Sequence, residues 1–156
     1  MINARRVRAR RAFFFMKRIL LIAALLSVAA DAPDAVVKYR QTVMKSLGAH
    51  MTAMSMVVVK KQIASRAQLA AHAEAVHAVS AGIVEMFPAP DKVRSSGKPE
   101  IWTRFPEFKA SAAKVERESA LLSQLAQKKE WKAFDAQFES VAKACEECHD
   151  RFRVRE

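Results

Sequence analysis

The chain has 156 residues, and its 27 Lys and Arg against 16 Asp and Glu give a formal net charge of +11. This length suits one domain, and a content of 51% hydrophobic residues excludes a disordered chain. Three glycines and five prolines exclude a collagen-like or linker-rich protein. Two cysteines are too few for a disulfide-dense scaffold or a four-cysteine zinc site.

Much of the positive charge lies at the N-terminus. Residues 1–30 contain seven basic residues and no acidic one, with an apolar run at residues 19–28 followed by two alanines. A basic region, a short apolar run and small residues are typical of a secretory signal peptide, and ten apolar residues are too few to span a bilayer. We therefore expect cleavage after Ala30 or Ala32, export to the periplasm and no permanent membrane anchor.

The start and the charge of the exported chain follow from this signal. Met16 begins a compact signal of its own and is an alternative start of the protein. Without residues 1–30 the chain keeps 20 basic and 16 acidic residues, a formal charge of +4. A nucleic-acid partner loses most of its electrostatic support at that charge, so we expect none.

Residues 31–156 are expected to form one helical domain. Gly is nearly absent, and no stretch shows the sustained apolar–polar alternation of a strand. Apolar residues at helical spacing predict four helices, with approximate ranges 34–61, 66–86, 102–128 and 131–153. Asp34 would cap the first helix, and Pro106 is tolerated only in the first turn of the third. The sequence therefore predicts an all-α, antiparallel four-helix bundle.

The last predicted helix carries the chemistry. Its apolar residues alternate in steps of four and three, as in a heptad, and both cysteines lie on this stripe. Residues 145–149 read Cys-Glu-Glu-Cys-His, the motif of c-type haem attachment. Cys145 and Cys148 lie on one face of a helical turn, so both thiols can add to the vinyl groups along one haem edge. His149 follows directly and can reach the iron as its proximal ligand.

Two other interpretations of the cysteine pair fit less well. A thioredoxin-type dithiol expects a βαβ context, which the helical pattern does not provide. A zinc site needs two further ligands, and the chain has no second cysteine pair. Covalent haem agrees with an exported protein, so we expect one haem c attached through two thioethers.

The second axial ligand has several candidates. Three methionines lie on the inner stripe of the first helix, and three histidines lie on the first two helices. They are Met44, Met51, Met54, His50, His72 and His77. Methionines at helical spacing are more often core residues than ligands. His72 lies near an apolar stripe and reads as a core or boundary residue, whereas His50 and His77 read as surface residues. Periodicity alone leaves this ligand open.

The whole exported chain resembles the cytochrome c' family. The resemblance is carried by Val37-Lys38-Tyr39-Arg40-Gln41, Pro99-Glu100-Ile101-Trp102, Phe108-Lys109 and the segment from Cys145 to Arg153. In five-coordinate members the residue three after the Arg-Gln pair is usually an apolar side chain such as Leu. Met44 stands at that position here, which resembles the low-spin cytochrome c-556 type, whose iron has His/Met ligation.

The resemblance also implies roles for two arginines. Arg40 would pair with a haem propionate, a charge-assisted contact that suits a guanidinium. Arg153 would be the basic residue beside the proximal face; alternatively it is a surface residue at a helix C-terminus. Relatives form antiparallel homodimers through the first two helices, and the run Val57-Val58-Val59 would contribute to such an interface.

Ligation determines the expected function. A thioether opposite an imidazole leaves no open position on the iron, so we expect a one-electron-transfer cytochrome that serves redox partner proteins. No distal acid–base pair of His and Arg is evident, and we expect no enzymatic activity. The alternative is a five-coordinate protein that binds nitric oxide or carbon monoxide, which requires Met44 to point away or to detach.

Overall fold

The structure is a computed structural model that describes residues 32–154. The expected signal peptide, residues 1–30, and the alternative start at Met16 lie outside the described residues. The helices are α2 (Pro33–Val58), α3 (Leu69–Ser80), the short 3-10 helix η1 (Val84–Met86), α4 (Glu100–Thr103), α5 (Phe105–Gln127) and α6 (Trp131–Phe152). Between residues 32 and 154 there is no strand, and extended pairing is limited to one isolated antiparallel bridge between Gly97 and Arg153.

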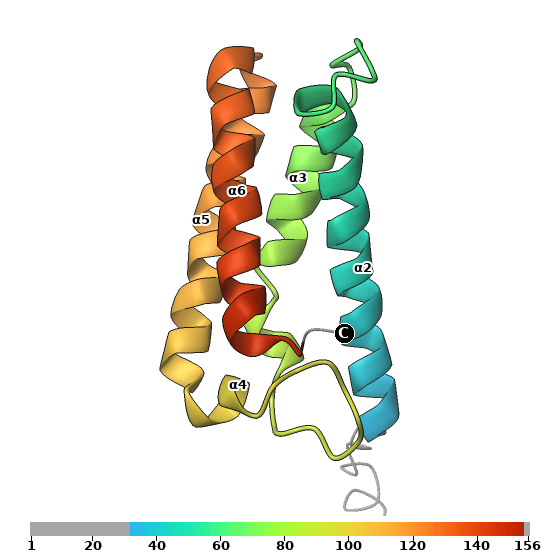
Figure 1. Ribbon diagram of the computed structural model, residues 1–156, viewed down its shortest axis with the longest axis vertical. Helices are drawn as coiled ribbons and strands as arrows, with labels where there is room; N and C mark the ends of the chain where they lie inside the picture. Colours follow the sequence, from blue (N-terminus) through green and yellow to red (C-terminus); the bar gives the residue numbers. More distant parts are fainter. Residues whose placement is uncertain (1–31, 155–156) are drawn as a thin grey trace, which may run out of the picture. The chain divides into compact units, whose positions relative to one another are not determined.

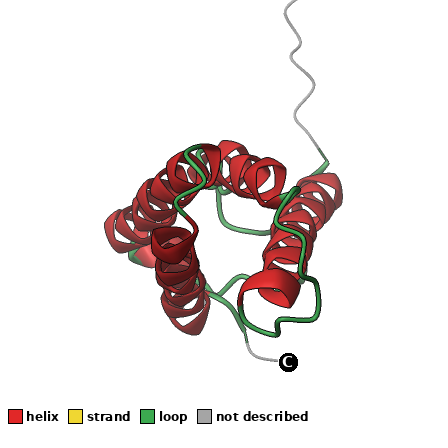
Figure 2. Ribbon diagram, turned by 90° about the horizontal axis from the view of Figure 1, so that it is seen from above, coloured by secondary structure: helices red, strands yellow, loops and turns green. Residues whose placement is uncertain are grey.

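The four long helices form an antiparallel bundle. Helices α2, α3, α5 and α6 run alternately up and down (Figure 1) and surround a common core when seen from above (Figure 2). Helix α3 packs against α2 and α5, and α6 packs mainly against α5. The predicted all-α four-helix bundle is therefore confirmed. None of the helices in the described part of the chain combines the length and the apolar character needed to cross a membrane.

The first helix begins differently from the prediction. Ala32 is its N-cap and Pro33 its first residue, so the prediction that Asp34 caps the helix was wrong. Proline suits this position because its missing N–H would have no helical partner there and its φ is already helical. Asp34 lies in the first turn, where its charge favours the positive end of the helix dipole.

The second and third predicted helices are interrupted. Helix α3 ends at Ser80, and the chain continues through a turn into η1, so the helix predicted to reach Met86 is shorter. The third is divided at Arg104 into α4 and α5, with Pro106 in the first turn of α5 as expected. A proline there cannot donate to Trp102, four residues earlier, and its ring collides with that carbonyl, which ends α4.

The core consists of two groups of buried side chains. The upper cluster fills the end of the bundle where α2 joins α3, and the lower cluster fills the opposite end, shown at the bottom of Figure 1. The largest residues of the upper cluster are Met54, Leu69, Leu122, Phe134 and Phe138. Those of the lower cluster are Met86, Phe87, Ile101, Phe108 and Phe152. Leu47 and Cys145 are half-buried and pack against both clusters.

Candidate functional site

The two cysteines lie on the last third of α6, at the boundary of the core. Both are free and half-buried; Cys145 packs against both clusters and Cys148 against the lower one. Burial raises the pKa of the Cys145 thiol. Burial, together with Cys145, raises the pKa of Cys148 to about 11, although the nearby Arg151 opposes the shift. Both thiols are therefore protonated at neutral pH, unlike the reactive thiolate of a redox dithiol.

Cys148 also borders an open groove between α5 and α6. This groove has a volume of about 300 Å³ and is lined by Cys148 together with the charged residues Lys114, Glu147 and Arg151. Lys114 Nζ donates to Glu147 Oε2 at 2.7 Å, which bridges the two helices beside the groove. Cys148 is thus accessible from this groove, whereas Cys145 does not line it and packs against both clusters.

His149 follows Cys148 on the last turn of α6 and is exposed. Partial desolvation lowers the pKa of its imidazole, the positive charge of Arg153 lowers it further, and Asp150 opposes both effects. The imidazole is therefore neutral at pH 7, the form that can bind a metal ion. Arg153 is exposed and ends the helix, with its backbone N–H donating to the His149 carbonyl at 2.8 Å. The role of Arg153 beside the proximal face of the haem stays a prediction.

The structure separates the three methionines that periodicity left equivalent. Met44 is half-buried and packs against the lower cluster, as Cys148 does. Met51 packs against the upper cluster, and Met54 is fully buried within it. Of these three, only Met44 approaches the core region that contains Cys148.

The histidine candidates are placed elsewhere. His50 and His72 face each other across α2 and α3, with 2.9 Å between their Nδ1 atoms. The prediction that His50 and His77 are surface residues was wrong, because both are half-buried. His77 Nδ1 is buried and has no hydrogen-bond partner within residues 32–154. His50 and His72 are therefore engaged with each other in the α2–α3 contact.

The residues near the motif fit a haem. On the inner stripe of α6, Cys145 and Cys148 are only half-buried, whereas Val141 and Phe152 on either side of them are buried. On α2, Met44 and Leu47 are half-buried as well. Trp102 packs against the same lower cluster, and its indole Nε1 is buried without an acceptor in the described part of the chain. A haem is a flat, largely apolar ring with carboxylates on one edge, and it therefore matches both the half-buried apolar residues and the unpaired N–H of Trp102. The donor set of two thiols, one imidazole and one thioether matches its iron and vinyl groups.

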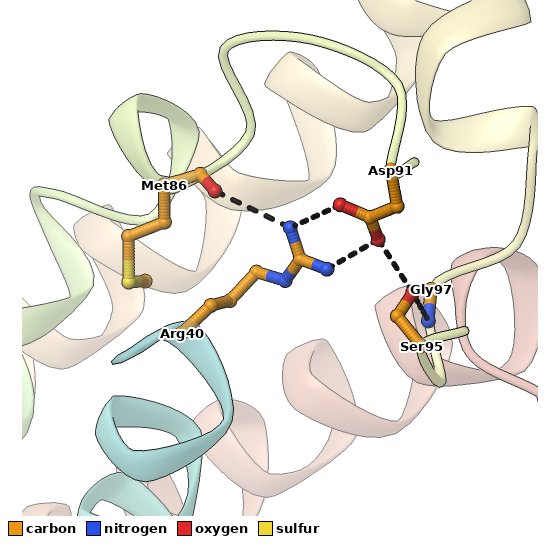
Figure 3. A network of polar contacts seen from close by, with 5 residues as sticks. All are labelled: Arg40, Met86, Asp91, Ser95 and Gly97. Atoms are coloured by element: carbon orange, nitrogen blue, oxygen red, sulfur yellow. Dashed lines mark hydrogen bonds and ion pairs between the residues drawn. The ribbon is translucent and has the colours of Figure 1, made fainter. Parts of the chain in front are cut away.

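Arg40 is buried, with 4% of its surface exposed, and has a partner that the sequence did not reveal. Its Nη1 and Nη2 donate to the two carboxylate oxygens of Asp91 at 3.1 and 2.5 Å, and Nη1 also donates to the Met86 carbonyl at 3.4 Å (Figure 3). Asp91 lies in a loop without periodicity, so no sequence pattern connects it with Arg40. A contact between Arg40 and a haem propionate stays a prediction.

Fold and site together define a class. An up-down-up-down bundle whose last helix carries Cys-x-x-Cys-His, with a methionine of the first helix reaching the same end of the core, is a c-type haem protein of the bundle kind. The comparisons with known proteins identify its family.

The sequence profile described as Cytochrome C' matches residues 35–153. A cytochrome c' from Pararhodospirillum photometricum is 32% identical over 124 residues, covering 78% of this chain and 98% of the relative. The cytochrome c' of Alcaligenes xylosoxydans xylosoxydans is 28% identical over 123 residues, covering 79% and 96%. The chain therefore belongs to the cytochrome c' family, whose members carry one covalent c-type haem.

Solved structures of the family agree with this fold. The nitric oxide complex of a Leu-to-Ala variant of cytochrome c prime from Alcaligenes xylosoxidans has a TM-score of 0.74 and 28% identity, and the match covers 81% of this chain and 99% of that one. A ferrous Arg-to-Lys variant of the same protein with bound NO has a TM-score of 0.73 and 27% identity, again over 81% and 99%.

Proposed function

We propose that this member of the family transfers single electrons and that Met44 occupies the distal position. The observation that carries this proposal is the place of Met44, which packs from α2 against the same cluster as Cys148 on α6. When bound, the haem supplies a one-electron iron couple. Cys145 and Cys148 would tether the haem, His149 would offer a neutral ring nitrogen to its iron, and Met44 would offer a thioether.

The second candidate is the binding of nitric oxide or carbon monoxide. The similar structures favour this candidate over the first, because four of them are nitric oxide complexes of a cytochrome c'. In this chain, a gas molecule approaching from the side of α2 would have to displace the Met44 thioether. The two candidate functions therefore differ in one measurable property, which is whether the Met44 thioether stays bound at the distal position.

The spectrum of the haem-loaded protein tests the first candidate. We expect low-spin spectra in both oxidation states for the wild type and conversion to high spin in Met44→Ala, because the variant loses the sixth ligand. Met51→Ala is the matched control, since Met51 packs against the upper cluster and its loss leaves the distal side intact. A wild-type protein with high-spin, five-coordinate ferrous haem would contradict the proposal.

Carbon monoxide titration of the reduced protein compares the two candidates directly. Slow or incomplete binding by the wild type, together with rapid binding by Met44→Ala, supports electron transfer. Rapid and complete binding by both proteins supports the gas-binding function instead. In that case Met44 packs in the core without holding the iron.

We further propose that the protein acts in the periplasm without enzymatic activity and exchanges electrons with partner proteins. A homodimer through α2 and α3 stays a prediction. The run Val57-Val58-Val59 supplies only one exposed valine, Val59, because Val58 belongs to the upper cluster and Val57 packs against it.

A further inference from the structure

The loop between η1 and α4, residues 87–99, crosses the lower end of the bundle and is held at both sides. We call this loop the strap. On the α2 side, the guanidinium of Arg40 makes two hydrogen bonds to Asp91 and lies 4.3 Å above the centre of the Phe87 ring. Asp91 is itself nearly buried, with 11% of its side chain exposed. A buried guanidinium requires such a counter-charge, and a two-bond pair also fixes the orientation of both groups.

On the α6 side, the strap pairs with the end of the helix. The Lys98 N–H donates to the Phe152 carbonyl at 2.9 Å, and the Val154 N–H donates to the Ser96 carbonyl at 2.8 Å. The Lys98 ammonium also donates to the Asp150 carbonyl at 2.8 Å. These bonds attach the last turn of α6 to the second half of the strap.

Asp91 connects the two sides. Ser95 Oγ donates to Asp91 Oδ2 at 2.5 Å, and the Gly97 N–H donates to the same Ser95 hydroxyl at 3.1 Å (Figure 3). Gly97 also forms the bridge with Arg153. A continuous series of hydrogen bonds therefore runs from Arg40 on α2, through Asp91 and Ser95, to the end of α6.

The attachment points lie one turn from the two candidate iron ligands. Arg40 precedes Met44 by four residues, which is about one helical turn. Phe152 follows His149 by three residues on α6. Helices α2 and α6 are not neighbours along most of the bundle, because α2 packs mainly against α3 and α6 against α5. In addition to the few direct contacts between α2 and α6, the strap joins the turn before Met44 to the turn after His149.

We propose that the strap sets the separation between the Met44 and His149 turns, and that Asp91 is its positioning residue. Asp91 has no role as an iron ligand; it acts through Arg40 on one side and through Ser95 and Gly97 on the other. When its carboxylate is lost, Arg40 loses its counter-charge and the strap loses its attachment to α2. The end of α2 that carries Met44 is then free to move relative to α6.

The test compares Asp91→Asn with Asp135→Asn in the exported, haem-loaded protein. Asp135 is a matched control, because it accepts two hydrogen bonds from Arg66, at 2.7 and 2.8 Å, next to the α2–α3 connection at the upper end. Each variant removes one carboxylate charge from a two-bond arginine pair. Only the first variant touches the strap.

Two readouts are expected to separate the variants. In Asp91→Asn, the amides of Lys98 and Val154 exchange with deuterium at least about tenfold faster, because the strap opens locally more often. The same variant gains a high-spin fraction in its ferrous spectrum, because Met44 is held less well. Asp135→Asn changes neither property. Equal exchange at Lys98 and Val154 in the two variants would overturn the proposal.

The exchange readout is independent of the proposed function, whereas the spectral readout rests on ligation by Met44. If the wild type is already five-coordinate, the electron-transfer proposal fails, and faster exchange in Asp91→Asn alone still supports the strap. If Asp91→Asn does not fold, Arg40→Lys takes its place, because a lysine keeps the charge and loses the two-bond geometry. Exchange at the wild-type rate in a folded Arg40→Lys protein would count against the proposal.

Discussion

At the scale of single residues, the buried indole N–H of Trp102 indicates a hydrogen-bond acceptor outside the polypeptide. Its indole Nε1 is buried without an acceptor in the described part of the chain, although its ring packs against Phe87 at 6.3 Å between centroids. Leaving a buried donor unpaired costs about 1–3 kcal/mol. We therefore expect a group outside the polypeptide, the haem edge or an ordered water, to accept this hydrogen bond in the loaded protein.

This expectation predicts the effect of Trp102→Phe. The variant keeps an aromatic ring but loses the N–H. The free energy of unfolding of the haem-loaded protein should therefore fall by about 0.5–1.5 kcal/mol more than the change of ring alone explains. Trp131→Phe is the control, because it shortens the second tryptophan at the upper end of the bundle, where it packs edge-on against Phe134. Chemical denaturation measures the free energy of unfolding of both variants. An equal decrease in the two variants would show that the Trp102 N–H has no partner.

Site residues that belong to a sequence motif or a helical stripe could be predicted from the sequence, whereas contacts between residues that only folding brings together could not. Cys145, Cys148 and His149 form a contiguous motif, and Met44 lies on a helical stripe that the sequence displays directly. Asp91 lies in an aperiodic loop 51 residues from Arg40, so only the folded chain brings the two together. The packing of Met44 against the lower cluster likewise depends on how α2 lies relative to α6.

At the scale of the elements, the His50–His72 contact links α2 to α3. The imidazole planes are tilted by 54°, with 5.2 Å between centroids, and one Nδ1 must carry the proton that the other accepts. Burial lowers the pKa of His72 below its ordinary value of 6.5, and the charge of His50 lowers it further. Protonation of both rings would replace a hydrogen bond between the helices by a repulsion.

The lowered pKa of His72 predicts a loss of stability in mild acid. The unfolded chain takes up a proton at His72 near pH 6.5, whereas the folded chain takes it up only at lower pH, so unfolding becomes easier as the pH falls through this interval. Glu107, Asp135 and Glu147 also have lowered pKa values, but their contributions are lost only in stronger acid, below their ordinary range. The free energy of unfolding should therefore fall between pH 7.5 and 5.5.

His72→Gln identifies the source of that loss. Glutamine keeps a polar side chain without a titrating ring, so the variant should lose less stability than the wild type over the same interval. Denaturant titrations at the two pH values measure the difference. The same loss in both proteins would exclude the His50–His72 contact as its cause.

The helix boundaries show where local sequence signals compete. The existence and order of the four long helices follow from apolar periodicity, and the end of α6 agrees within one residue. The end of α3 does not follow, because Ile83 and Met86 continue the helical spacing while the backbone turns after Ser80 into η1. Their side chains enter the lower cluster either way, so the apolar pattern cannot distinguish a helix from a turn followed by η1.

At the scale of the whole molecule, cleavage of the predicted signal peptide would change the charge of the protein. Removal of residues 1–30 would reduce the formal charge from +11 to +4, before the haem propionates are counted. We predict that protein purified after export and haem attachment has the intact mass of a chain beginning at Asp31 or Pro33 plus one haem. Mass spectrometry decides this, and a product that retains the basic N-terminal segment would contradict the predicted cleavage.

The division of the core into two clusters has a consequence for what the haem stabilises. The upper cluster fully buries Met54, Leu122 and Phe134, and of the two motif cysteines only Cys145 packs against it. Cys148 and Met44 pack against the lower cluster, and both are half-buried. We therefore expect the haem to complete the core at the lower end, so that the upper end depends on it less.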